Sequence, residues 1–313
     1  METYPLKSMS LYEAQEKQFK IVDIITKNMR GKEFLQLGDL GITQGLNKPN
    51  KTKIVEKIIA EIFDAQACIL TRGAGTQALR WGLLAGASPN EKILIHKAPI
   101  YPTTEINIRN MNLKVIEYDF NNLETLHNLL EDKEIKFCLL QHTRQKLDDR
   151  YDLEEVIKKI KESRKDIIIL VDDNYAVMKV NRTGNELGAD MSAFSTFKLL
   201  GPVGIGCLIG KKKLLEKVEK YNYSGGGQVQ GYEAMEVLRG LTYAPVALAI
   251  QAQENEKLIE ELNKVEKYPY IKKAFLANAQ SKVLLVEFKE NIADKILTEA
   301  EILGALPNPV GAE

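Results

Sequence analysis

Three short segments of this chain combine residue types that could bind an anion and react with an amine or a carbonyl group. The first, residues 71–78, places Gly73, Ala74, Gly75 and Thr76 between an apolar run and an amphipathic stretch. Glycines let the backbone approach a ligand, and a helix N-terminus offers unpaired N–H groups with a partial positive charge. The segment predicts a phosphate-binding turn, with a glycine turn used only for packing as the alternative.

The second segment is Asp172-Asp173-Asn174-Tyr175, directly after the apolar run 167–171. A carboxylate at the end of a buried strand is unfavourable unless a cation or a hydrogen-bond donor meets it. One of the two aspartates is therefore a candidate partner for a cationic group of a ligand. The alternative is a loop cap.

The third segment contains Lys198, which stands between Phe197 and Leu199 in a stretch typical of a protein core. Burial disfavours the ammonium form, so it favours the neutral amine that can form a Schiff base. The other lysines are expected on the solvated surface. Lys198 is therefore the candidate nucleophile.

These segments follow apolar runs that alternate with helix-like stretches between residues 67 and 210. The runs are 67–70, 93–95, 115–118, 137–140, 167–171 and 205–209, and the helical stretches are 76–85, 103–110, 123–130 and 153–161. This pattern predicts an α/β fold with a mainly parallel sheet covered by helices on both faces. Such sheets bind ligands beyond the carboxyl ends of their strands, where the three segments lie.

Beyond residue 210 the pattern changes. A charged helix is predicted at 211–220, a long helical region at 230–265 that is bent or broken near Pro245, a strand at 283–288 and a helix at 293–303. We expect an N-terminal arm over the active site at 1–50, a large domain at 51–264, and a smaller α+β lobe at 265–313 that is incomplete.

Composition narrows the class of protein. Lys+Arg and Asp+Glu both total 43, and this neutral balance argues against a nucleic-acid-binding protein. Neither a signal peptide nor an apolar run long enough for a membrane span is recognised. The three cysteines are widely spaced among apolar residues, which predicts reduced thiols, no metal site and a cytoplasmic protein.

Taken in their order along the chain, these segments resemble the large domain of fold-type I pyridoxal-phosphate enzymes. The families concerned are the aminotransferase class V-like and the cystathionine-lyase-like enzymes. The resemblance runs from about residue 47 to 248 and is greatest to an uncharacterised bacterial group of aminotransferase-like proteins. The motifs that carry it are Ala74-Gly75-Thr76, the 96–104 segment around Tyr101, Asp172-x-x-Tyr175, Ser195-x-x-Lys198 and the glycine-rich 224–228 stretch, which is similar to that of cysteine desulfurases.

The resemblance implies a seven-stranded sheet, pyridoxal 5'-phosphate as cofactor and two catalytic residues. Lys198 would hold the cofactor covalently and move protons at the substrate Cα. Asp172 would pair with the pyridine nitrogen and keep it protonated. Asp173 is the alternative, but Asp172 has the tyrosine at the family spacing. Tyr175 would reach the ring hydroxyl.

The remaining cofactor contacts are also implied by the resemblance. Ala74, Gly75, Thr76 and the Ser195 hydroxyl would bind the phosphate. Tyr101 would stack on the ring, with His96 as the alternative stacking residue.

Two residues after the fourth apolar run, His142 and Arg144, are candidates for substrate binding. Arg144 could bind a carboxylate bidentately or be a solvated charge. Relatives hold the substrate carboxylate with an arginine of the final lobe, and this chain has none beyond Lys282.

The predicted activity is that of an enzyme acting on an amino acid or related amine through an external aldimine, aminotransferase-like or C–S/Cβ-lyase-like. We expect a homodimer with sites at the subunit interface. One alternative is a non-catalytic pyridoxal-phosphate-binding or regulatory protein. Another is a nicotinamide-dependent oxidoreductase, because Gly73-x-Gly75-x-x-Ala78 matches the dinucleotide fingerprint. That fingerprint expects an acidic residue about 20 positions on, where this chain has His96-Lys97.

Overall fold

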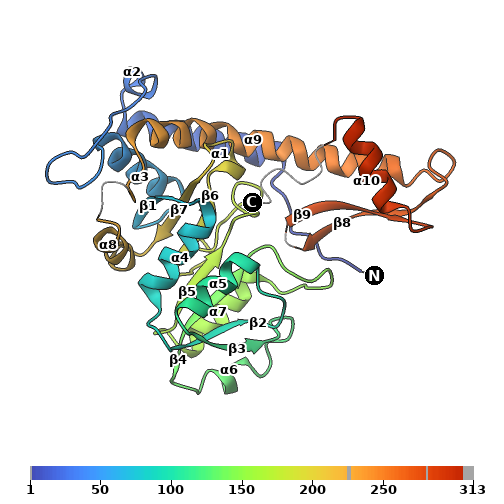
Figure 1. Cartoon of the computed structure of the whole chain (residues 1–313), viewed down its shortest axis with the longest axis horizontal. Helices are drawn as coiled ribbons and strands as arrows, with labels where there is room; N and C mark the ends of the chain where they lie inside the picture. Colours follow the sequence, from blue (N-terminus) through green and yellow to red (C-terminus); the bar gives the residue numbers. More distant parts are fainter. Residues whose placement is uncertain (1, 224–226, 280, 306–313) are drawn as a thin grey trace.

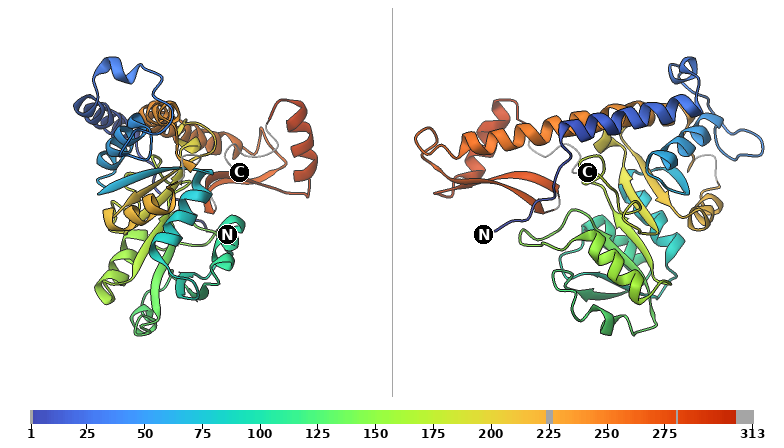
Figure 2. Two further views of the ribbon diagram at one scale, coloured as in Figure 1. Left: turned by 60° about the vertical axis from the view of Figure 1, so that its left-hand side comes forward. Right: turned by 180° about the vertical axis from the view of Figure 1, so that it is seen from behind.

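The computed structural model describes residues 2–223, 227–279 and 281–305. A large sheet covered by helices forms most of the molecule, and a small hairpin with one helix projects to one side (Figure 1 and Figure 2). The long helix α9, Gly231–Leu262, runs along the top of the sheet and out to the hairpin. The fold therefore has the predicted large domain and smaller α+β lobe.

The large sheet has seven strands in the order β1-β7-β6-β5-β4-β2-β3. Its strands are β1 Ala67–Arg72, β2 Lys92–His96, β3 Lys114–Tyr118, β4 Ile135–Gln141, β5 Ile168–Asp172, β6 Met191–Ser195 and β7 Ile205–Gly210. All neighbouring strands are parallel except β7, which runs antiparallel to both β1 and β6. The predicted mainly parallel, seven-stranded sheet is confirmed.

Strand β6 is the one that the apolar runs do not reveal. Its sequence, Met-Ser-Ala-Phe-Ser, has no β-branched residue, yet all five residues are buried. It forms because β5 and β7 flank it on both sides and satisfy its backbone. Tertiary pairing, and not local propensity, places the strand that leads to Lys198.

Helices cover both faces of the sheet. Alternate residues of β5 point to opposite faces, so Leu170 packs beneath one helical layer while Ile169 and Val171 pack beneath the other. Helices α4, α5 and α8 contribute to the first layer and α1, α3, α6, α7 and α9 to the second. Their bounds are α1 Leu11–Asn28, α3 Asn50–Ile62, α4 Ala74–Gly86, α5 Pro102–Asn110, α6 Leu126–Leu129, α7 Leu153–Ser163 and α8 Lys212–Tyr221.

Helix α9 was predicted to be bent or broken near Pro245. It is one continuous helix through this residue, so the alternative of a break is wrong. A proline in a helix interior removes one hydrogen bond and crowds the preceding turn, which costs about 3 kcal/mol. Packing of α9 against α1 and α3 offsets this cost, since Leu238, Leu241 and Ala244 are buried in the same core as those helices.

The C-terminal lobe consists of strands β8, Ile271–Ala279, and β9, Ser281–Phe288, followed by α10, Ala293–Ile302. The two strands form an antiparallel hairpin. Strand β8 was not predicted, because its sequence is rich in lysine, alanine and asparagine. Residues 306–313 lie outside the described residues, and the expectation of an incomplete lobe stays a prediction.

The first fifty residues, which were predicted to form an arm over the active site, fold partly into helices. They include the 18-residue helix α1 and the short helix α2, Gly31–Phe34. Ile21, Ile24 and Ile25 of α1 are buried in the core shared with α3 and α9. The apolar face of α1 explains this: a helix with such a face is stable only when the face is buried.

Within residues 2–223, 227–279 and 281–305, no helix is both long and apolar enough to cross a bilayer. The same residues contain no group of three or more His, Cys, Asp or Glu side chains arranged to hold a metal ion.

Candidate active site

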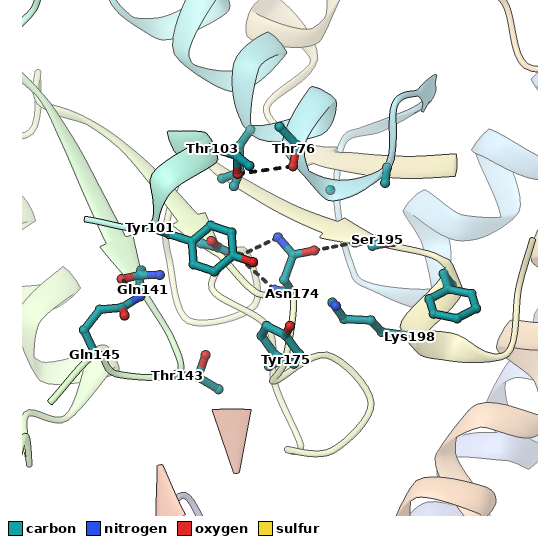
Figure 3. Close-up of a pocket in the computed structure, with 15 residues that line it drawn as sticks. Thr76, Tyr101, Thr103, Gln141, Thr143, Gln145, Asn174, Tyr175, Ser195 and Lys198 are labelled. Carbon is teal, nitrogen blue, oxygen red and sulfur yellow. Dashed lines mark hydrogen bonds between the residues drawn. The ribbon is translucent and has the colours of Figure 1, made fainter. Parts of the chain in front are cut away.

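A cavity of about 590 Å³ lies where β4, β5 and β6 end and α4 begins (Figure 3). It contains all eight residues predicted to bind the cofactor, although they come from four separate segments. Its lining residues are Ala74, Gly75, Thr76, Leu79, Tyr101, Thr103, Gln141, Thr143, Gln145, Asp172, Asn174, Tyr175, Ser195, Phe197 and Lys198. The parallel strands bring these residues together, because their carboxyl ends meet at one edge of the sheet.

The N-terminus of α4 forms one wall of the cavity. The chain leaves β1 through Gly73 and Ala74, both with positive φ (100° and 56°), and both N–H groups donate to the carbonyl of Gly204. No side chain caps the helix, so the N–H groups of Gly75 and Thr76 have no partner inside it. These N–H groups and the Thr76 hydroxyl can therefore receive an anion.

Gly75 is required because Asn174 lies directly against it. A Cβ at this position would come within 2.0 Å of Asn174 Oδ1. Asn174 cannot easily move, because its Oδ1 accepts from the Ser195 N–H (2.8 Å) and its Nδ2 donates to Asp172 Oδ1 (2.8 Å). The glycine turn thus has a steric role in positioning Asp172.

Asp172 faces the cavity, and Asp173 does not. Asp172 Oδ1 also accepts from the Asn174 backbone N–H (3.0 Å). Burial raises the pKa of Asp172 above its usual value, while the Asn174 hydrogen bonds and the charge of Lys198 act in the opposite direction. Asp173 is fully buried and binds His142 Nδ1 (2.6 Å) and the Gly184 N–H (2.9 Å) instead. The geometry therefore favours Asp172 for contact with a ligand.

Lys198 lies on a 3₁₀ turn, Phe197–Leu199, that follows β6. Its Nζ lies 4.0 Å from the centre of the Tyr175 ring, and both side chains reach into the cavity (Figure 3). The Thr196 hydroxyl donates to the Ile205 carbonyl (3.0 Å) and anchors the turn. Lys198 is half-buried, so it is less enclosed than the sequence predicted, because the cavity itself gives it an opening.

Tyr101 occupies the opposite wall, at the N-cap of α5. Nearby, the hydroxyls of Thr103 and Thr76 lie 3.3 Å apart. His96, the alternative stacking residue, does not line this cavity. Its Nδ1 accepts from the Phe120 N–H (3.2 Å), and its Nε2 binds Asp149 Oδ1 (2.9 Å).

The segment after β4 sends alternate side chains in two directions. Gln141, Thr143 and Gln145 line the cavity, whereas His142 and Arg144 line a different hollow. The Arg144 guanidinium donates to the carbonyls of Tyr4 and Tyr151 (both 2.5 Å), and His142 is held by Asp173. The structure therefore does not bring the predicted substrate-binding pair into the cavity.

Sequence reasoning missed five polar lining residues: Asn174, Thr103, Gln141, Thr143 and Gln145. A usable signal existed for most of them, because side chains of an extended segment alternate between two sides. Once Asp172 is assigned to the cavity, the same alternation assigns Asn174.

The other predicted feature, the 224–228 stretch, falls partly outside the described residues, which omit 224–226. The described Gln228 accepts a hydrogen bond from Arg72 Nε at its carbonyl (3.2 Å).

Comparison with known proteins agrees with this geometry. The model of the aminotransferase class-V family matches residues 47–248, which is most of the chain. The chain belongs to the class-V aminotransferase family. A second model, of the YhfS-like C-terminal domain, matches residues 256–313 of this family member.

The protein YhfS of Escherichia coli (strain K12) is 48% identical over the whole of this class-V chain and 86% of its own length. Its crystal structure, described as that of a pyridoxal-5'-phosphate dependent protein, has a TM-score of 0.96 and covers 100% of this chain and 86% of its own. These findings bear out pyridoxal phosphate as the predicted cofactor and the YhfS-like group as the predicted relatives.

More distant relatives are similar over less of the sequence. A cysteine desulfurase of Wigglesworthia glossinidia brevipalpis is 32% identical over 150 residues, 48% of this chain and 32% of its own. A carbon-sulfur lyase involved in aluminum resistance from Clostridium novyi has a TM-score of 0.68 at 18% identity, over 92% of this chain and 73% of its own. The second likeness concerns the fold.

The nicotinamide alternative finds no support in the family or in the sheet. A dinucleotide fingerprint joins two neighbouring parallel strands through its helix. In this class-V chain β1 lies at the sheet edge and pairs antiparallel with β7, while β2, which follows α4, lies near the other edge. The glycine turn therefore belongs to a different crossover.

Proposed function

We propose that this protein is a pyridoxal-phosphate-dependent enzyme that acts on an amino acid or a related amine. The observation that carries the proposal is the joint presence, in one cavity, of the Lys198 amine, the Asp172 carboxylate and the open N-terminus of α4. An amine, an acid and an anion-binding helix end match the aldehyde, the pyridine nitrogen and the phosphate of this cofactor.

The residues fit the group at each of these points. The N–H groups of Gly75 and Thr76, with the hydroxyls of Thr76 and Ser195, would hold the phosphate. Asp172, whose orientation is set by Asn174, would pair with the protonated pyridine nitrogen. Tyr101 would stack on the ring. The bound cofactor supplies an electron sink for carbanion chemistry at the carbon that bears the substrate amine.

Lys198 is the residue that would move protons. Its Nζ lies beside the Tyr175 ring, so the tyrosine limits where the amine can reach. After leaving the cofactor, the neutral amine would take the proton from the substrate Cα and return it to a neighbouring atom. The atom that receives the proton distinguishes an aminotransferase-like reaction from a C–S or Cβ-lyase-like one. We propose one of these two reaction types.

The charges of the cavity bear on the substrate. Among the lining residues of the described chain, Lys198 and Asp172 alone are charged, and the remaining polar lining is neutral. Arg144 and Arg72 are engaged elsewhere, Arg72 with Glu233 (2.6 Å). The substrate would therefore be oriented within this cavity by neutral groups, chiefly Gln141, Thr143 and Gln145.

A spectroscopic experiment tests the proposal. The purified protein with added pyridoxal phosphate should gain visible absorbance, and borohydride should fix the cofactor to the Lys198 peptide in mass spectrometry. Lys198→Ala should abolish the fixation, whereas Lys212→Ala, on the exposed face of α8, should not. Wild-type protein that neither absorbs nor retains the cofactor would refute the proposal.

A screen of amines then separates catalysis from mere binding. An enzyme should change its spectrum with some amino acids or amines and release a keto acid, ammonia or a thiol. A protein that binds the cofactor and responds to no amine in the screen would favour the competing function, a non-catalytic binding or regulatory protein.

We also propose a homodimer with the sites near the subunit boundary. Leu35, Leu37 and Leu40 are 80%, 78% and 74% exposed, and Leu200 and Val203, on the loop after Lys198, are 57% and 66% exposed. Large exposed apolar side chains of this kind are typical of an interface when they gather.

Contacts with α9 place the two groups of exposed residues around one helix. The Arg239 guanidinium donates to the carbonyls of Phe34 and Gln36, next to the first group. The backbone of Leu200 lies so close to Gly240 that a Cβ there would come within 2.5 Å of it. A partner that covers this surface would lie against the loop that carries Lys198.

Sedimentation of a Leu37→Asp/Leu40→Asp variant tests the dimer. The variant should be monomeric and bind the cofactor more weakly, whereas Leu297→Asp on exposed α10 should leave the wild-type dimer intact. A monomeric wild type would refute this part of the proposal.

We further propose a cytoplasmic location, because Cys68, Cys138 and Cys207 are free thiols, as expected in a reducing compartment.

A further inference from the structure

A second, small hollow that opens to solvent lies between the N-terminal segment, the loop after β5, helix α9 and strand β9. It is separate from the Lys198 cavity, with which it shares no lining residue. Two lysines reach it from distant parts of the sequence, and no carboxylate is among its described lining residues. Its lining residues are Ser8, Lys179, Leu248, Gln251, Ala252, Asn255 and Lys282.

Lys179 is half-buried and its backbone is fixed. Its carbonyl accepts from the Met9 N–H, and its N–H donates to the Ala176 carbonyl (both 2.9 Å). In the described residues its amine makes no hydrogen bond or ion pair. Burial lowers the pKa of Lys179, and the charge of Lys282 lowers it further. The two ammonium groups therefore repel each other in a partly desolvated place.

Among the described residues of the C-terminal lobe, Lys282 alone lines this hollow. Its Nζ donates to Ser8 Oγ (2.7 Å), which leaves the serine hydroxyl proton free to point toward a third group. Burial also lowers the pKa of Lys282, and Glu256, an exposed residue of α9, opposes this effect only through space. Glu256 makes no ion pair with Lys282 within the part of the chain that the structure describes.

Three other enclosed lysines of the described residues are paired with acids. Lys17 lies 3.8 Å from Glu186, and Lys161 lies 2.6 Å from Asp190. The buried Lys48 lies 2.8 Å from Glu56. This pattern follows the general rule that buried charges are paired. The hollow at Lys179 and Lys282 departs from this rule, because its described lining residues include two cations and no anion.

We propose that Lys179, Lys282 and Ser8 form a binding site for a small anionic group, a carboxylate or a phosphate. Each lysine can donate a charge-assisted hydrogen bond, and Ser8 can donate a third. The anion would offset the repulsion between the two cations. It would also join the C-terminal lobe, through Lys282, to the loop after β5, through Lys179. This loop follows Asp172 and contains Tyr175.

Thermal denaturation of the full chain tests the site without any catalytic assay. Inorganic phosphate should raise the melting temperature of the wild type more than chloride does at equal ionic strength. Lys282→Met and Lys179→Met should each weaken phosphate binding, so that the half-saturating phosphate concentration rises by about tenfold or more. Lys257→Met, an exposed residue of α9 paired with Glu254, should respond as the wild type does.

The unliganded variants provide a second readout. Replacing one of two repelling cations with an apolar side chain of similar length should leave the melting temperature in chloride equal to or above that of the wild type. A clear loss of stability in Lys179→Met would contradict an uncompensated charge. Equal responses to phosphate in the wild type and all three variants would also overturn the site.

A further arm identifies the source of the anion and rests on the proposed function. The cofactor-loaded protein is titrated with an amino acid and with the matching amine that lacks the carboxylate. If the anion is the substrate's own carboxylate, Lys282→Met weakens binding of the amino acid but not of the matching amine, and phosphate competes with the amino acid. If the anion is a separate ligand, phosphate stabilises the protein without competing. Because the denaturation arm needs no cofactor, failure of the proposed function would leave it intact.

Discussion

The substitution Gly75→Ala tests how the glycine turn, Asn174 and Asp172 depend on one another. The added Cβ would lie 2.0 Å from Asn174 Oδ1, so the asparagine side chain must leave its place. Two hydrogen bonds break when it moves: Ser195 N–H to Asn174 Oδ1, and Asn174 Nδ2 to Asp172 Oδ1. Asp172 then loses a side-chain donor that fixes its orientation.

The size of the effect follows from these two bonds. Ser195 is buried, so its unsatisfied N–H costs about 1–3 kcal/mol, and the lost hydrogen bond to a carboxylate costs about 1.5–3 kcal/mol. Alanine in place of glycine within α4 returns at most about 1 kcal/mol. We expect a net loss of about 3 kcal/mol in the free energy of unfolding, or roughly 6–12 °C in melting temperature. Affinity for pyridoxal phosphate should fall by at least about tenfold.

Thermal denaturation and cofactor titration of a double-mutant cycle measure this coupling. Asn174→Ala alone should lose the same hydrogen bonds, and the double variant Gly75→Ala/Asn174→Ala should be about as stable as Asn174→Ala. Gly31→Ala is the control, since a Cβ there has no atom within 4 Å. Additive losses in the double variant, or a Gly75→Ala protein as stable as the wild type, would refute the steric argument.

The remaining predictions concern the acids of the site and its surroundings. Asp172→Asn should retain pyridoxal phosphate but lower the rate of any amine reaction by about 100-fold or more, because the neutral amide cannot stabilise a protonated pyridine. Asp173→Asn should instead lower the melting temperature, since Asp173 binds His142 and Gly184. The reverse result would mean that the wrong carboxylate was chosen. Burial alone would raise the pKa of Asp149, but hydrogen bonds from His96, Asn121 and the Lys146 N–H bring it below its usual value. A carboxylate with a lowered pKa stabilises the fold fully above its unfolded pKa of about 4, and this stabilisation declines as the pH falls below that value. The stability difference between the wild type and Asp149→Asn, followed by denaturation from pH 7 to pH 2, should therefore narrow only below about pH 4, and a constant difference would contradict the lowered pKa.

The sequence alone was informative wherever the signal is local. The apolar runs before Thr71, Asp172 and Gly210 predicted strands, because strands covered by helices on both faces need continuous apolar residues. The glycine pair at Gly73 and Gly75 predicted the turn into α4. The order of these segments, with Lys198 after them, resembled one family and pointed to its cofactor.

Local signals were insufficient where an element depends on its neighbours. Strand β6 lacks β-branched residues and exists because β5 and β7 pair with it. Helix α9 continues through Pro245 because α1 and α3 pack against it. In both cases a tertiary contribution outweighs an unfavourable local preference of a few kcal/mol.

The direction of individual side chains was also decided only in three dimensions. His142 and Arg144 follow β4, the strand next to the one that carries Asp172, yet they point away from the cavity and Gln141 and Thr143 point into it. The pairing of Lys179 with Lys282 joins residues about 100 positions apart, and nothing in either neighbourhood announces it. The amino-acid sequence determined which segments fold into strands, turns and helices, and which reactive groups they carry. The tertiary structure decided which of those groups meet, because a meeting depends on the packing of elements far apart in the chain.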